Sequence, residues 1–524
     1  MTTGIIMSGT YVQAGLMAEF GKIPPSFLPL GNLRLYRQQI AMMQAHCDKV
    51  YLTTPDDFEL PPRDRAVLEE LGVQVLPCNK SLTVAEALLD GLSKIPDLDD
   101  RLIVLFGDSL FSGLTKIPAD SYSAHSAVDE YKWDPAPIND RSPDQDADAL
   151  VVSGLFSFSS TAVLKDALTE CDRGIIAALR RYDKSRPLEM LTDGDWFDFG
   201  HTQTYYISCG FITTQRSFNS LQIRRQQVEK SSQDTQKMRA EANWFEKLPQ
   251  NMRVYAPTYL GRTELNGETV GYRTENTYLS TLASLASFGN LNRNTWTSIF
   301  ESCNEFLCDS AKFTAPDETA VEIDNYYHAK TEVRLKRFGD ETGFDITSAL
   351  TLNGVAVPSP VQMAVESADL IRSTPVPAPT FIHGDFCFSN IFFDFRSRMT
   401  KAIDPRGISP SGEITVFGDP RYDVAKLSHS ALGRYDAIIS GDVTASRAGY
   451  DFGLDIDAIN TPAWLAIDGA FHDAGILTSD IGRSVNSAIM VHLFLSMIPL
   501  HADQPARQTA FLANAARLYL DLEK

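Results

Sequence analysis

The chain has 524 residues, of which 44% are hydrophobic, and a net charge of −20 from 47 Lys and Arg against 67 Asp and Glu. This length excludes a single small module and predicts two to four domains with ample apolar material for their cores. The charge disfavours nucleic acid or anionic lipid as a partner, because no basic block offsets it. Any phosphate-bearing substrate must therefore meet local cations, metal ions or backbone amides.

Strands alternate with helices over the first part of the chain. Strands are predicted at 4–7, 49–52, 73–76 and 102–106, and helices at 33–45, 63–71 and 82–92. This alternation predicts an α/β domain with a mainly parallel sheet and helices on both faces. Near residue 215 the chain becomes polar and basic. A helix is expected at 238–248, and the rest is mostly helical, with strands and turns around 380–420.

Cysteine usage and the N-terminus indicate the compartment. The seven cysteines are scattered without a C-x-x-C pair, so we expect neither a disulfide framework nor a zinc site. The N-terminus lacks the features of a signal peptide, and no stretch approaches the roughly 20 apolar residues of a spanning helix. We therefore predict a soluble, cytoplasmic protein without membrane insertion.

The strongest motif is F-I-H-G-D-F-C-F-S-N-I at residues 381–391, followed by Asp404 in A-I-D-P-R. Phosphoryl transfer from a nucleotide needs a carboxylate to orient the attacking hydroxyl, and oxygen ligands to hold Mg²⁺ on the phosphates. Asp385 and Asn390 on one loop and Asp404 at a strand end can converge as such groups. Taken singly, each could be an unrelated polar loop residue, but the three in this order favour a phosphoryl-transfer site.

This pattern resembles the aminoglycoside phosphotransferase and choline kinase superfamily, whose signature is H-G-D-x-x-x-x-N followed by an aspartate. The resemblance covers about residues 216–524 and implies a bilobal, protein-kinase-like α+β domain, with an N-lobe at 216–285 and a helical C-lobe at 286–524. It implies that Asp385 is the catalytic base, that Asn390 and Asp404 bind Mg²⁺, and that His383 braces the loop.

Further residues fit the same resemblance. The segment G-D-P-R-Y-D-V-A-K at 418–426 implies that Asp423 buttresses the catalytic loop. Such a kinase also needs a strand lysine for the nucleotide phosphates and a helix glutamate that holds it; Lys230 and Glu241 are the candidates, although both could be surface charges. No clear glycine-rich loop precedes Lys230, and the segment 216–220 is the candidate cover of the nucleotide.

The first half holds a different set of residues. A strand ends in the loop S-G-T at 8–10, followed by G-K-I-P-P-S-F-L-P-L at 21–30, F-G-D at 106–108 and W-F-D-F-G-H at 196–201. This order resembles the sugar-nucleotide pyrophosphorylase family over roughly residues 1–212. The resemblance implies a nucleotidyltransferase-like domain, placed at 1–215. It also implies nucleotide binding by Ser8, Gly9 and Lys22, and metal binding by Asp108 and Asp198.

The resemblance of the first half has gaps. The loop reads S-G-T-Y-V-Q-A-G where the family has G-G-x-G-T-R, so the family's arginine is missing. Pro25 stands where the family's P-K-x-x-L-P has its lysine. An inherited fold that no longer transfers nucleotides is therefore an alternative. His201, beside Asp198, could touch a substrate phosphate or equally cap a following strand.

Together the resemblances imply a bifunctional enzyme. It would phosphorylate a small hydroxylated metabolite, a sugar or choline-type alcohol, with ATP, and then transfer a nucleotidyl group from a second NTP to that phosphate, for surface polysaccharide or lipid head-group synthesis. Mg²⁺ is the expected cofactor, small molecules are the expected partners, and homo-oligomerisation stays open. The alternatives are a kinase with an inactive N-terminal domain, and a non-catalytic nucleotide-binding regulator of polysaccharide assembly.

Overall fold

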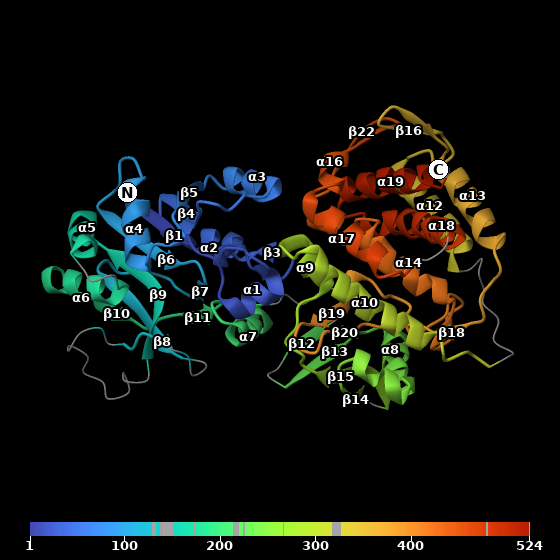
Figure 1. Ribbon diagram of the computed structural model, residues 1–524, viewed down its shortest axis with the longest axis horizontal. Coiled ribbons are helices and arrows are strands. Elements are labelled where there is room, and N and C mark those ends of the chain that lie inside the picture. Colours follow the sequence, from blue (N-terminus) through green and yellow to red (C-terminus); the bar gives the residue numbers. More distant parts are fainter. Residues whose placement is uncertain are drawn as a thin grey trace. The chain divides into compact units, whose positions relative to one another are not determined.

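The computed structural model describes residues 1–127, 131, 133–136, 138, 150–170, 174–212, 220–223, 226–265, 267–316, 326–477 and 480–522. The chain forms two compact units, Met1–Thr213 and Thr214–Lys524, described separately below (Figure 1). The expected boundary at 215 and most of the segment 216–220 lie outside the described residues. The expected domain limits stay predictions.

A seven-stranded, mostly parallel sheet forms the centre of the first unit, with the strand order β10-β8-β9-β6-β1-β4-β5. The strands are β1 (Thr2–Met7), β4 (Lys49–Pro55), β5 (Gln74–Cys78), β6 (Arg101–Phe106), β8 (Ser121–Ser126), β9 (Leu150–Phe158) and β10 (Glu189–Leu191). Strands β6, β1, β4 and β5 run parallel, whereas β9 is antiparallel to both of its neighbours. The α/β class expected from the sequence is confirmed.

Helices cover both faces of this sheet because successive strand residues point to opposite sides. Ile5 and Val104 belong to one core, and Ile6 and Leu105 belong to the other. The first core is closed by α4 (Val84–Ser93), α5 (Thr161–Thr169) and α6 (Ile175–Ser185), and the second by α2 (Leu35–Gln44) and α3 (Pro62–Glu70).

A separate two-stranded sheet positions Asp108 and Asp198 of this unit. β7 (Ser109–Ser112) pairs antiparallel with β11 (Asp195–Asp198), and the register sets Asp198 opposite Ser109. The loop after β1 leads into α1 (Ala14–Phe20), and β11 leads into α7 (Thr202–Ile212). Asp108 and Asp198 therefore lie at the same end of the β7–β11 pair.

The second unit begins with a four-stranded antiparallel sheet in the order β12-β13-β15-β14. Its elements are β12 (Ser220–Ile223), β13 (Gln227–Ser231), β14 (Tyr259–Leu265), β15 (Glu268–Glu275) and the helix α8 (Thr235–Lys247). Phe245 of α8 packs on Tyr272 of β15 and on Tyr259 of β14, with ring centroids 5.4 and 5.6 Å apart. Helix α8 thus packs against this sheet.

The remainder of this unit is mainly helical, as expected. The longer helices are α9 (Leu282–Phe288), α10 (Arg293–Ser310), α12 (His328–Thr342), α13 (Pro360–Arg372), α14 (Pro420–Ala431), α17 (Pro462–Asp473), α18 (Asp480–Met497) and α19 (Pro505–Leu520). Short strand pairs interrupt them: β18 (Thr380–Phe381) with β21 (Phe417–Gly418), and the hairpin of β19 (Ile391–Asp394) with β20 (Met399–Ala402). The H-G-D-x-x-x-x-N motif lies between β18 and β19.

One expectation needs correction. The segment Gly482–His501 is long and apolar enough to cross a membrane by length and composition, with a mean hydropathy of 1.3. Its burial inside the protein is 72%, because α12, α13, α14 and α19 pack around it, so it has the character of a core helix. None of the six cysteines in the described part of the chain belongs to a disulfide.

Candidate active sites

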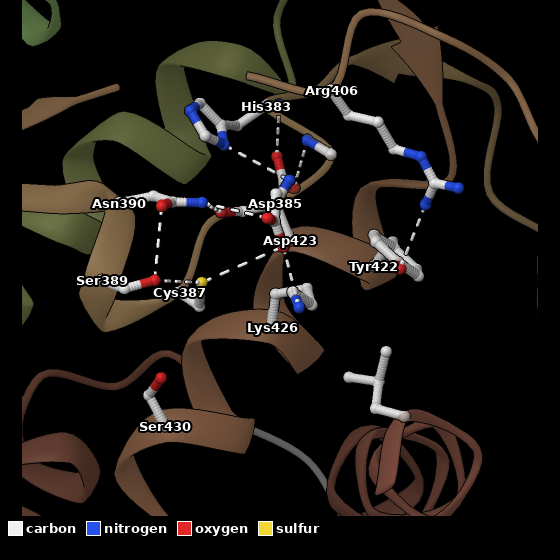
Figure 2. A network of polar contacts seen from close by, with 12 residues as sticks. His383, Asp385, Cys387, Ser389, Asn390, Arg406, Tyr422, Asp423, Lys426 and Ser430 are labelled. Atoms are coloured by element: carbon white, nitrogen blue, oxygen red, sulfur yellow. Dashed lines mark hydrogen bonds and ion pairs between the residues drawn. The ribbon is translucent and has the colours of Figure 1, made fainter. Parts of the chain in front are cut away.

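The motif at 381–391 forms a tightly held turn (Figure 2). Gly384 has a φ of +76°, and a β-carbon there would meet Arg406 Cβ at 2.7 Å, so this position requires glycine. The Asp423 carboxylate accepts hydrogen bonds from the backbone N–H of His383 at 2.6 Å and of Gly384 at 2.8 Å. Trp244 of α8 donates its indole N–H to the Ile382 carbonyl at 2.8 Å. The loop is thus fixed from both lobes.

The Asp385 carboxylate is held by two side chains. Lys426 Nζ lies 2.8 Å from Asp385 Oδ1, and Asn390 Nδ2 donates to Asp385 Oδ2 at 3.0 Å (Figure 2). Burial raises the pKa of Asp385, but the Lys426 ammonium outweighs it and lowers the pKa to about 2. The side chain is 42% exposed. Asp385 is therefore a fixed, accessible anion suited to orienting a hydroxyl group.

His383 and Cys387 surround this carboxylate without chemistry of their own. Burial lowers the pKa of His383 to about 4, so its ring is neutral, and its Nδ1 accepts a hydrogen bond from the Asp385 N–H at 3.3 Å. Burial raises the pKa of Cys387 to about 12, so the thiol stays protonated. Both side chains support the loop.

Lys230 and Glu241 meet in the N-lobe, and Asp404 joins them. Lys230 Nζ lies 2.6 Å from Glu241 Oε2 and 3.1 Å from Asp404 Oδ1. Lys230 is 5% exposed and Glu241 is 1% exposed, so neither is a surface charge. Burial lowers the pKa of Lys230, but Asp404 and Glu241 outweigh it and raise the pKa. The ammonium therefore stays charged and is placed for phosphate oxygens.

Asn390 and Asp404 lie at the same end of the β19–β20 hairpin. Ile391 pairs with Ala402, and the Ile403 N–H donates to the Asn390 carbonyl at 2.9 Å. Asp404 has a φ of +57°, a conformation that Asp and Asn adopt more readily than other residues with a β-carbon. These two residues can offer a carboxylate and an amide oxygen to Mg²⁺, with nucleotide phosphates as further ligands.

Lys426 is a site residue to which the sequence analysis assigned no role. It is three residues after Asp423 on α14, so both side chains lie on the helix face toward the catalytic loop. The i, i+3 spacing of Asp423 and Lys426 within the segment G-D-P-R-Y-D-V-A-K is the signal that could have shown it.

We expect Asp423→Ala to destabilise the second unit. The substitution leaves two buried N–H donors, those of His383 and Gly384, without an acceptor, at about 1–3 kcal/mol each. Ser430→Ala is the matched control on the same helix, because its hydroxyl accepts only one such bond, from Phe388 N–H at 3.1 Å. Chemical denaturation should show the larger loss for Asp423→Ala; equal losses would contradict a buttressing role.

In the first unit, Asp108 and Asp198 converge on Gly200. A β-carbon at Gly200 would meet Asp108 Oδ2 at 2.6 Å and Asp198 Oδ1 at 3.3 Å, so both carboxylates surround one point. Burial and the charge of Asp198 raise the pKa of Asp108 to about 6. Paired carboxylates repel each other unless a cation offsets the charge, so this pair fits a divalent metal. Within the described part of the chain, no cluster of three or more His, Cys, Asp or Glu suits a metal.

The His201 ring contacts the Asp198 carboxylate. His201 Nδ1 is 3.0 Å from Asp198 Oδ2, and the ring stacks on Tyr131 with centroids 3.8 Å apart. The Thr204 hydroxyl also donates to Asp198. The expectation that His201 caps a following strand is wrong, because helix α7 follows it and the Tyr205 N–H donates to the His201 carbonyl at 2.8 Å. His201 orients the Asp198 carboxylate.

The other three candidates of this unit are engaged in protein contacts. Ser8 is fully buried; its N–H donates to Thr53 Oγ1 at 2.8 Å, and its hydroxyl accepts from Ser26 N–H at 3.0 Å. Gly9 packs closely, since a β-carbon there would meet Cys78 Cβ at 2.9 Å. Neither offers a free side-chain donor to a nucleotide.

Lys22 Nζ lies 2.9 Å from Asp57 Oδ2, and Lys80 Nζ lies 2.5 Å from the same oxygen. The Tyr11 hydroxyl donates to the other Asp57 oxygen at 2.7 Å. The structure thus places Lys22 in an exposed ion pair with Asp57. Exposed pairs of this kind contribute only about 0–1 kcal/mol, so a phosphate could displace Asp57.

We expect Gly200→Ala to abolish divalent-metal binding by the first unit. The added methyl would occupy the space between the Asp108 and Asp198 carboxylates. Gly174→Ala is the matched control, because a β-carbon there meets nothing within 4 Å. Mn²⁺ titration of the full chain, in a background where Asp404→Asn weakens the other site, should show the loss in Gly200→Ala only; retained binding would exclude the carboxylate pair.

No protein-family model matches the sequence, and no curated protein matches it. Similar solved structures include the inositol-1-phosphate CTP transferase of T. maritima, with 14% identity, a TM-score of 0.31 and coverage of 40% of this chain and 96% of that chain. HddC from Yersinia pseudotuberculosis has 16% identity and a TM-score of 0.30, covering 41% of this chain and 100% of its own.

Aminoglycoside phosphotransferases are also among the similar structures. The GDP complex of aminoglycoside 2'-phosphotransferase-IIIa has 12% identity and a TM-score of 0.37, with coverage of 59% of this chain and 91% of that chain. The neighbours thus include nucleotidyltransferases and phosphotransferases. At these identities the likeness assigns no activity, and the function has to be inferred from the site residues.

Proposed function

We propose that the second unit phosphorylates a small hydroxylated metabolite with ATP and Mg²⁺. The observation that carries this proposal is the chain of contacts Glu241–Lys230–Asp404 beside an exposed, charge-fixed Asp385. A buried lysine held by a helix glutamate, next to a metal-binding aspartate, is the arrangement that phosphoryl transfer requires.

The residues would divide the work as follows. Lys230 binds the α- and β-phosphates, while Asn390 and Asp404 hold Mg²⁺, which neutralises charge on the phosphates. Asp385 accepts a hydrogen bond from the acceptor hydroxyl and aims its oxygen at the γ-phosphorus. The new O–P bond forms as the bond between the γ-phosphorus and the bridging oxygen breaks. ADP leaves with that electron pair, and the hydroxyl proton passes to Asp385.

We further propose that the first unit is a nucleotidyltransferase, favoured by the carboxylate pair at Gly200. The phosphate monoester made by the second unit would attack the α-phosphorus of an NTP, and pyrophosphate would leave with the electrons of the broken P–O bond. Asp108 and Asp198 would hold the Mg²⁺ that offsets charge on the triphosphate. A cytoplasmic role in surface polysaccharide or lipid head-group synthesis belongs to the same proposal.

Two product assays test these activities separately. ADP release with Mg-ATP and an acceptor panel reports the kinase, and pyrophosphate release with each NTP and the phosphorylated product reports the transferase. Asp385→Asn should stop only the first, and Gly200→Ala only the second. ADP release without pyrophosphate release would leave a kinase with an inactive first unit. Nucleotide binding with neither product would make the protein a non-catalytic regulator.

A further inference from the structure

A group of cations that the proposed chemistry does not use flanks the catalytic loop. The Arg406 backbone N–H donates to the His383 carbonyl at 2.9 Å, and its Nη1 donates to the Tyr422 hydroxyl at 3.3 Å (Figure 2). Tyr422 and Lys426 are one turn apart on α14, and Lys426 is the partner of Asp385. The Arg406 guanidinium therefore lies close to the reacting position.

Helix α12 carries two more cations, Lys330 and Arg334, near Tyr422. The rings of Tyr326 and Tyr327 pack against the Tyr422 ring, with centroids 5.5 and 6.1 Å away. Lys330 follows Tyr327 by three residues and Arg334 follows Lys330 by four, so the two cations share one face of α12. The charge of Tyr422 acts on both of them. Both side chains are half-buried.

The positive charge of these side chains shifts the pKa of the Tyr422 phenol. Burial raises the pKa of Tyr422, but Lys330, Arg406 and Lys426 outweigh it and lower the pKa to about 8. The Tyr422 phenol itself raises the pKa of Lys330, yet burial and the charges of Arg406, Arg334 and Lys426 together lower it. The four cations thus act on one another at close range.

Carboxylates do not balance this group. In the described residues, no ion pair involves Lys330, Arg334 or Arg406, and Lys426 already neutralises Asp385. Asp419 is paired with Arg421 at 2.7 Å, and Asp423 accepts the backbone N–H groups of the loop. Partly buried cations repel each other unless an anion offsets their charge. The arrangement therefore calls for an anionic ligand.

We propose that the acceptor of the phosphoryl group is itself an anion, carrying a carboxylate or a phosphate that Lys330, Arg334 and Arg406 bind beside Asp385. This inference rests on the proposed kinase function and narrows it. Hydroxy acids and sugar phosphates fit, whereas the cations would repel choline-type alcohols. Guanidinium groups match the planar fork of an oxyanion, and local positive charge on a chain of net charge −20 would steer such a substrate to the site.

Matched acceptors that differ in charge test the proposal. ADP release with Mg-ATP is measured with glucose, glucose 6-phosphate, glucuronate and choline, and compared with the rate without acceptor. We expect stimulation by glucose 6-phosphate or glucuronate only, and these two separate a phosphate from a carboxylate as the recognised group. Stimulation by glucose or choline equal to that by the anions, or no stimulation by either anion, would overturn the proposal.

Variants of α12 test whether Lys330 binds the anionic acceptor. Lys330→Gln should raise the KM for the anionic acceptor about 10- to 100-fold, the value of one charge-assisted hydrogen bond, and leave the KM for ATP unchanged. Lys336→Gln, an exposed lysine on the same helix, is the matched control and should change neither KM. An equal rise in the KM for ATP would mean that Lys330 serves the nucleotide, which would overturn the inference.

Different results would contradict the anionic acceptor and the kinase proposal. Asp385-dependent ATP turnover with neutral or cationic acceptors alone would sink the anionic acceptor and keep the kinase. Turnover that Asp385→Asn does not change would sink the kinase itself. Lys330→Gln breaks no hydrogen bond among the described residues, whereas Arg334 Nη1 donates to the Ser496 carbonyl at 3.0 Å. The lysine variant therefore reports on binding without a packing defect.

Discussion

Asp385→Asn is expected to reduce ATP-dependent turnover about 10²–10⁴-fold, the usual cost of losing a catalytic base. The amide has the same shape but cannot take up the hydroxyl proton. The substitution also removes the ion pair between Asp385 and Lys426, whose atoms lie 2.8 Å apart. Because this pair fixes the side chain, the orientation of the acceptor oxygen is lost as well. ADP release under saturating ATP measures the effect.

Asp394→Asn is the matched control for this variant. Asp394 caps the exposed turn of the β19–β20 hairpin: one carboxylate oxygen accepts from Arg396 N–H and the other from the Ser397 hydroxyl. An asparagine keeps an oxygen for the Arg396 N–H and loses only the exposed bond from Ser397. Its turnover should match the unmodified chain. Near-normal turnover in Asp385→Asn, with ATP still bound, would show that the H-G-D motif is not a phosphotransferase loop.

Asp404→Asn is expected to raise the Mg²⁺ concentration for half-maximal turnover more than about 10-fold and to cut turnover at saturating Mg²⁺. Asparagine tolerates the φ of +57° at this position, so the backbone stays in place. The neutral oxygen offsets less of the dication's charge. The variant also removes the carboxylate that lies 3.1 Å from Lys230 Nζ, which disturbs phosphate binding.

A Mg²⁺ titration of ADP release checks this prediction, with Asn390→Ala measured in parallel. The Asn390 variant should show the milder Mg²⁺ effect, because it loses only a neutral carbonyl oxygen. Its turnover should fall as well, since its amide no longer donates to Asp385 at 3.0 Å. An unchanged titration curve for Asp404→Asn would exclude this carboxylate as a ligand.

Local pattern was sufficient for the elements and for the catalytic loop. The strands predicted at 49–52 and 102–106 correspond to β4 and β6. Their residues 50–52 and 102–105 are apolar and buried, as expected for strands covered on both faces. Asp385 and Asn390 could be grouped because only four residues of one loop separate them, so short-range hydrogen bonds decide their geometry.

Charge partners from different elements could not be predicted in this way. The contact between Asp385 and Lys426 depends on how α14 packs under the loop, and the position of Lys22 on Asp57 depends on two separate loops. Charged side chains are compatible with many exposed positions, so a sequence pattern does not specify which opposite charge each will meet. The structure therefore showed that Lys426 pairs with Asp385 and that Lys22 pairs with Asp57.

By itself the sequence determined the α/β elements of the first unit and the mainly helical character of the second. It also picked out the H-G-D-x-x-x-x-N loop and the two aspartates of the first unit as candidate site residues. Only the tertiary structure decided that Asp108 and Asp198 surround one point at Gly200. It also decided that the charges of Lys330 and Arg406 act on Tyr422, while neither cation forms an ion pair among the described residues. Periodicity and loop spacing reflect interactions between near neighbours in the chain. The charge balance of a site reflects which distant segments pack together, and that is settled only when the chain folds.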